Sequence, residues 1–75
     1  TIAYSIPTAS NTSLRVYNIK GQVVKTLVNG VVEAGNHSIT WNGRDDNGTS
    51  VASGVYFYRL SSEGQTITKK MVLSK

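Results

Sequence analysis

The chain has 75 residues, with eight Lys or Arg against four Asp or Glu, a net charge of +4 and no cysteine. A chain this short buries only roughly 60% of the surface that its unfolded form exposes, so we expect a single domain over residues 1–75 with a thin core. The composition excludes disulfide bridges and a cysteine-based zinc site as sources of stability. It also excludes a membrane span, since no apolar run approaches the roughly 18 to 20 residues that one requires.

The basic residues do not form a nucleic-acid-binding pattern, which requires cations clustered on one face with aromatic residues between them. Only Lys69, Lys70 and Lys75 gather, and they do so at the end of the chain. We therefore expect no nucleic-acid partner. Because the chain begins at Thr1 without a methionine, we expect a piece of a longer protein.

The first part of the chain predicts three strands, over residues 1–6, 13–19 and 22–28. Apolar and polar residues alternate in the first two, which is typical of a strand with one face against a core. In the second strand, Leu14 and Val16 share the face that we expect to be buried. Asparagine and glycine between the second and third strands predict a hairpin turn.

The middle of the chain predicts a change of sheet. A turn at residues 29–30 precedes the short stretch 31–34, which we expect to cross from one sheet to the other. Residues 37–42 alternate again and predict a strand with Trp41 in the core between the sheets. The glycine-rich, aspartate-rich and asparagine-rich stretch 43–54 has the composition of a loop.

Two further strands, over residues 55–61 and 65–73, form a predicted hairpin around a tight turn at Glu63 and Gly64. No window has apolar residues at helical spacing. Several short strands separated by frequent turns favour an all-β fold, an immunoglobulin-like antiparallel β-sandwich of six to seven short strands.

The sequence offers no arrangement for catalysis. The single histidine, His37, precedes Ser38 in a strand, where neighbouring side chains point to opposite faces and cannot share a proton. No pair of acids has the apolar surroundings that tune one of them as a general acid. We therefore predict that the chain is not an enzyme and uses no cofactor.

The stretch 45–48, Asp-Asp-Asn-Gly, has the oxygen density of a calcium loop but neither its spacing nor its closing glutamate. We expect its side chains to bond nearby backbone amides as Asx-turns and expect no metal site. Weak cation binding stays open from the sequence. A second alternative concerns Tyr56 and Tyr58, which would form a sugar-stacking platform if they lay on an open face and would otherwise contribute to the core.

An ordered set of short motifs resembles a bacterial family. The set begins with Ile2-x-Tyr4-x-Ile6-Pro7 and continues with Trp41-Asn42-Gly43, Asp46-x-Gly48, Ser53-Gly54-Val55-Tyr56 and Lys70-Met71-Val72-Leu73. It is similar to the C-terminal sorting domains of bacterial type IX secretion and to the related immunoglobulin-like domain of flagellar hook-capping proteins. The likeness covers nearly the whole chain.

The resemblance to sorting domains implies a non-catalytic C-terminal targeting domain that directs an attached cargo protein through type IX secretion to the cell surface. It implies three partners, namely an outer-membrane secretion translocon, a surface transpeptidase and a covalently attached upstream cargo domain. The implied location is secreted or cell-surface, reached through the periplasm of a Gram-negative bacterium. The alternative is a permanent structural or adhesive immunoglobulin-like module of a larger surface or flagellar-scaffold protein.

The same resemblance implies a recognition surface on the last two strands, where a Gly-x-Tyr motif and a basic, apolar terminal strand match the family. Its expected residues are Gly54, Tyr56, Lys69, Lys70, Met71, Val72, Leu73 and Lys75. If residues 68–73 lie at a sheet edge, their free backbone groups are able to pair with a receptor strand. The other interpretation is that the lysines only protect the edge and that the apolar residues only fill the core.

Overall fold

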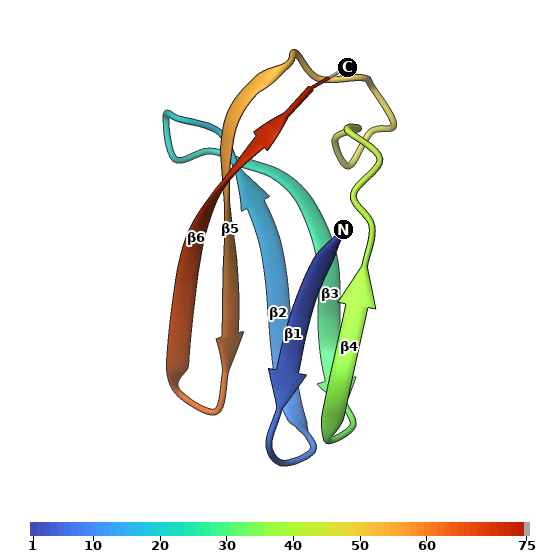
Figure 1. The fold of residues 1–75 in the computed structure, drawn as a ribbon, viewed down its shortest axis with the longest axis vertical. Coiled ribbons are helices and arrows are strands. Elements are labelled where there is room, and N and C mark those ends of the chain that lie inside the picture. The colour runs from blue at the N-terminus through green and yellow to red at the C-terminus, as the bar shows by residue number, and fades with distance from the viewer. Residues whose placement is uncertain (75) are drawn as a thin grey trace.

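The computed structural model describes residues 1–74, which form six strands in two antiparallel sheets and contain no helix (Figure 1). The strands are β1 (Ile2–Ile6), β2 (Ser10–Tyr17), β3 (Val23–Val32), β4 (Gly35–Ile39), β5 (Gly54–Ser62) and β6 (Gln65–Leu73). The predicted immunoglobulin-like β-sandwich is confirmed. In the part of the chain that the structure describes, no helix is long and apolar enough to cross a membrane.

The two sheets differ in width. The smaller sheet pairs β1 with β4, and the larger one has the order β3-β2-β5-β6. In Figure 1, β1 and β4 lie in front of the half of the larger sheet that contains β2 and β3, while β5 and β6 extend to the left. The front layer therefore covers only part of the sheet behind it.

The core lies between β1 and the centre of the larger sheet. Leu14 and Val16 of β2 are fully buried, at 0% exposure, which confirms the buried face predicted for that strand. Leu14 forms one cluster with Ile2 of β1 and Leu60 of β5. These side chains hold the two sheets together by removing apolar surface from water.

Short-range features determine both hairpin turns. After β2, the Asn18 side-chain oxygen accepts hydrogen bonds from the backbone N–H groups of Lys20 and Gln22, at 2.9 and 3.0 Å, and so ends the strand in an Asx-turn. Between β5 and β6, Glu63 and Gly64 both have positive φ, at 51° and 76°. Positive φ at both central residues is the geometry of a type I′ turn, which matches the twist of the flanking strands.

The predicted turn at residues 29–30 is wrong. Gly30 lies inside β3 and pairs with Thr12, because β2 begins earlier than predicted and offers partners as far as Ser10. The strand therefore continues through Val32, and the chain changes sheet after that residue.

The predicted position of Trp41 is only partly correct. Strand β4 ends at Ile39, so Trp41 follows the strand and is only half-buried. Its ring meets that of Tyr56 edge-on, with centroids 5.1 Å apart. Trp41 therefore packs beside β5, outside the cluster that joins the two sheets.

Candidate functional site

The last hairpin carries the predicted recognition residues, and its second strand, β6, is an edge strand. It pairs with β5 along one side only within residues 1–74. Lys69 and Lys70 are both exposed and, as neighbours in a strand, point to opposite faces of the sheet. Lys69 is paired with Tyr58, on the face that looks toward the smaller sheet.

The other residues of the predicted set differ in accessibility. Val72 is 69% exposed on the outer face, whereas Met71 and Leu73 are half-buried on the inner one. Gly54 pairs with Leu73 at the start of β5. Lys75 lies outside the described residues.

Tyr56 has a structural environment. Its side chain is 8% exposed, and its hydroxyl donates a hydrogen bond of 2.7 Å to the backbone oxygen of Ala52. Together with the edge-on contact with Trp41, this bond ties the end of the preceding loop to β5. Because Tyr56 is buried, Tyr56 and Tyr58 do not together form the open sugar-stacking platform considered as an alternative.

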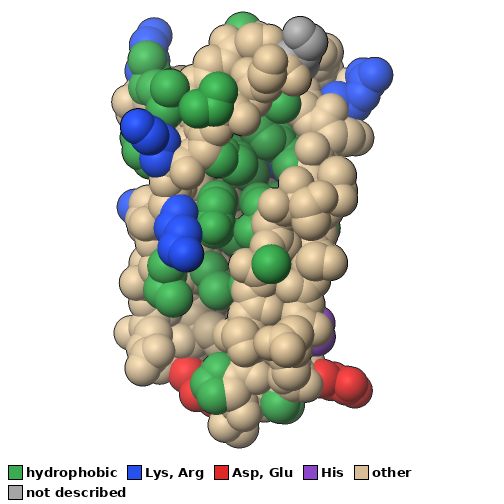
Figure 2. Space-filling view, viewed as in Figure 1, with side chains coloured by type: hydrophobic (Ala, Val, Ile, Leu, Met, Phe, Trp, Pro, Cys, Tyr) green, Lys and Arg blue, Asp and Glu red, His purple; other side chains and the backbone are tan. Residues whose placement is uncertain are grey.

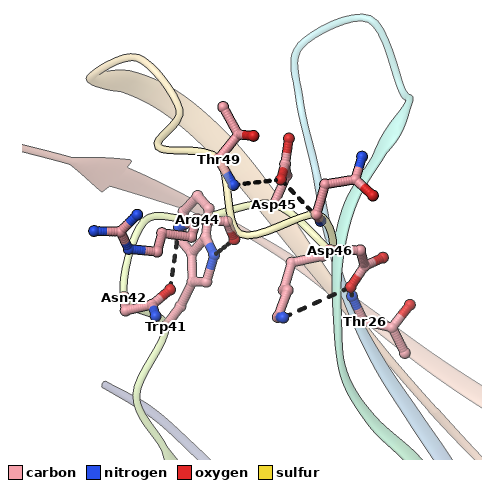
Figure 3. A network of polar contacts seen from close by, with 9 residues as sticks. Thr26, Trp41, Asn42, Arg44, Asp45, Asp46 and Thr49 are labelled. Atoms are coloured by element: carbon pink, nitrogen blue, oxygen red, sulfur yellow. Dashed lines mark hydrogen bonds and ion pairs between the residues drawn. The ribbon is translucent and has the colours of Figure 1, made fainter.

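Figure 3 shows the polar network of the loop between β4 and β5. The Asp45 carboxylate accepts hydrogen bonds from the backbone N–H groups of Asn47 and Thr49, at 3.0 and 2.9 Å. Gly48 takes φ of 80°, a value that residues with a Cβ rarely adopt. The Asx-turn prediction for residues 45–48 is confirmed for Asp45. It is wrong for Asp46, whose side chain bonds a distant strand instead of the nearby amides.

Asp46 fastens this loop to β3. Its carboxylate accepts a hydrogen bond of 3.1 Å from the Thr26 N–H and lies 3.8 Å from the Lys25 ammonium group, while its own N–H donates to the Val24 oxygen at 3.1 Å. These backbone groups face outward where the register of β3 against β2 shifts. The loop therefore covers part of the edge that β3 would otherwise expose.

The two loop aspartates are thus engaged by backbone amides. Among residues 1–74, no group of three or more histidine, cysteine, aspartate or glutamate side chains is placed to hold a metal ion. His37 stacks on Tyr4 with ring centroids 5.4 Å apart, and its Nε2 lies 2.7 Å from the backbone oxygen of Glu33. His37 lies in a strand, as predicted, and is half-buried there.

A feature that sequence reasoning missed is the inter-sheet groove, which runs along the free side of β1 above the inner face of β5 and β6. Three hollows follow one another along β1, and the central one has a volume of 440 Å³. The groove is lined on its larger-sheet side by Tyr58, Leu60, Ile67, Lys69, Met71 and Leu73. One interpretation of the sequence placed the apolar residues of this strand in the core, but the unequal width of the sheets leaves their face open.

The comparisons with known proteins support one of the two families that the sequence resembles. The FlgD Ig-like domain family matches residues 2–66. The crystal structure of FlgD from P. aeruginosa is 30% identical in sequence, with a TM-score of 0.72 over 95% of this chain. The chain covers 57% of the length of that FlgD. No curated protein matches the chain.

These findings support the similarity to flagellar hook-capping proteins. They give no support to the similarity to type IX sorting domains. They also agree with the arrangement of strands described above, since the structural match extends over nearly the whole chain. The chain belongs to the FlgD Ig-like domain family.

Proposed function

We propose that this chain is a non-catalytic structural module, permanently attached within a larger flagellar-scaffold or surface protein. The observation that carries the proposal is the 30% identity to P. aeruginosa FlgD over 95% of the chain. The chain accounts for 57% of that FlgD, which agrees with a module that works as one part of a longer protein. FlgD proteins cap the flagellar hook, so the proposed role is to hold or space other parts of such a scaffold.

The physical properties of the fold support a structural role. Its loops are fastened by backbone hydrogen bonds, as at Asp45 and Asp46, and its turns are set by local chemistry. Rigid connections of this kind transmit position from one end of a domain to the other. The acidic side chains of the loop are engaged in maintaining its shape.

A second candidate function is the sorting label of type IX secretion, with the translocon and the transpeptidase as its partners. The observation that favours it is the free edge of β6, where Lys69, Lys70 and Val72 are exposed. An edge strand with unpaired backbone groups is a common handle for recognition by strand addition.

The fate of the domain separates the two functions. The full native gene product would be produced in its own host with one epitope tag upstream of residue 1 and a second within the turn at residues 63–64. A permanent module keeps both tags in one polypeptide at its final location, as measured by immunoblotting. Release of the second tag during export would contradict the structural proposal and support the sorting label.

A charge variant provides the matched control. Lys69→Ser with Lys70→Ser alters two exposed side chains of β6 and leaves the core unchanged. The structural proposal predicts unchanged export for this variant. Cargo trapped in the periplasm with the domain still folded would instead identify β6 as a sorting signal.

A further inference from the structure

The smaller sheet ends at β1, which has a free edge. Within residues 1–74, β1 pairs with β4 and with no other strand, although the facing sheet has four strands. In an antiparallel pair, alternate residues direct their N–H and C=O groups away from the partner strand. Strand β1 therefore presents a row of backbone donors and acceptors along the inter-sheet groove.

The floor beside this edge is apolar and incompletely covered. Ile67 is 50% exposed, and Tyr58 and Met71 are only half-buried, although all three lie on the inner face of the larger sheet. Figure 2 shows a column of apolar side chains down the middle of this face of the molecule. A strand added next to β1 would cover them, as β1 and β4 cover the other half of the sheet.

The edge also lacks the features that block strand addition. Residues 2–6 contain no charged residue and no proline, and their pairing with β4 has no register shift. The two edges of the larger sheet, in contrast, contain Lys25 on one side and Lys69 with Lys70 on the other. Charges on edge strands discourage unwanted pairing, and β1 has none.

The charged residues that line the groove indicate which side chains an added strand would carry. Lys69 lines the central hollow, and Glu63 lines the hollow at the Pro7 end. We infer that the free edge of β1 binds an extended segment of a partner protein by strand addition, with apolar side chains at alternate positions and an acidic side chain opposite Lys69. This inference goes beyond the proposed function and does not depend on it.

A second copy of the chain does not fit this edge. Antiparallel pairing of two β1 strands requires a twofold axis normal to the smaller sheet, which leaves both larger sheets on the same side. Each larger sheet would then occupy the space of the other copy's β5 and β6, because these strands extend beyond β1. A single strand adds only about 4.8 Å of width and meets no such obstacle.

The test uses the isotope-labelled 75-residue chain and a synthetic nine-residue peptide that alternates valine and threonine, with glutamate in place of the central valine. We expect the peptide to shift the NMR signals of residues 2–6 and to slow hydrogen exchange of their outward amides. Two N-methylated versions each block one set of alternate peptide amides. One version must lose binding and the other must keep it, since only one set faces β1.

A charge exchange tests the position of the acidic side chain. A peptide with lysine in place of the glutamate should bind at least about twofold more weakly, the size expected for an exposed charge pair. Lys69→Glu should reverse this preference. Lys70→Glu, the matched change on the opposite face of the same strand, should leave it unchanged.

Several results would overturn the inference. They are an absence of spectral change at millimolar peptide, changes confined to the outer edge of β6, and equal effects of the two lysine variants. Protection of the β1 amides by self-association would assign the edge to a second copy. If the β1 amides are protected in a longer chain that includes the residues before Thr1, the groove binds that preceding segment.

Discussion

The two edges of the larger sheet differ in how far other parts of the domain cover them. At β3, the loop between β4 and β5 bonds to the strand, with Asp46 joined to Thr26 and Val24. At β6, nothing in residues 1–74 pairs with the outer side of the strand, and the inner face next to it opens into the inter-sheet groove. One side of the sandwich is thus closed by specific hydrogen bonds, while the other offers backbone groups and apolar surface to a partner. The strand addition inferred above therefore lies on the open side of the sandwich.

The largest expected effect contrasts the packed centre with the open side. Leu14→Ala should reduce the free energy of unfolding by about 2–5 kcal/mol, because it leaves a cavity at a fully buried position. Ile67→Ala should cost less than about 1 kcal/mol, since half of that side chain already contacts water. Urea denaturation measures both. Equal losses would mean that the groove is closed in solution.

The next effect tests the closed edge. Asp46→Ala should cost about 1–2 kcal/mol, because it removes a charged acceptor from the Thr26 N–H. Lys25→Gln is the control for the ion pair alone and should cost less than about 0.5 kcal/mol, since the pair is exposed and 3.8 Å long. If both variants lose the same amount in thermal and chemical denaturation, the hydrogen bond is not what fastens the loop.

A smaller effect is expected at the end of the loop. Tyr56→Phe keeps the ring against Trp41 and removes only the hydrogen bond to Ala52, so it should cost about 0.5–1.5 kcal/mol. Tyr17→Phe serves as the control, because the Tyr17 ring lies under Arg59 on the outer face and its contact does not use the hydroxyl. Denaturation midpoints that shift equally for the two variants would contradict the assigned role of the Tyr56 hydroxyl.

The smallest effect on stability is expected for the two lysines of the open edge strand, β6. Lys69→Ser with Lys70→Ser should change the free energy of unfolding by no more than about 0.5 kcal/mol, because both side chains are exposed. The double variant should associate more readily at high concentration, since edge lysines oppose strand pairing between molecules. Light scattering of the folded variant measures this association. If the variant stays monomeric, the lysines do not protect the edge against pairing.

The sequence by itself determined the features that depend on neighbouring residues. Alternation along residues 1–6 and the turn before residues 65–73 predicted strands with these ends within a residue, and Leu14 with Val16 marked the buried face. The Asp45 turn was predictable because its hydrogen bonds span only a few residues. Such interactions are complete within one segment of the chain.

Only the tertiary structure decided what depends on pairing between distant strands. Gly30 continues a strand because Thr12 lies opposite it, and Trp41 contacts Tyr56 because the loop between them turns back. The inter-sheet groove exists because two strands face four, a count that no local pattern contains. The strand and turn preferences of each segment could be predicted from its own residues. The place where apolar surface stays uncovered follows from how the two sheets pack.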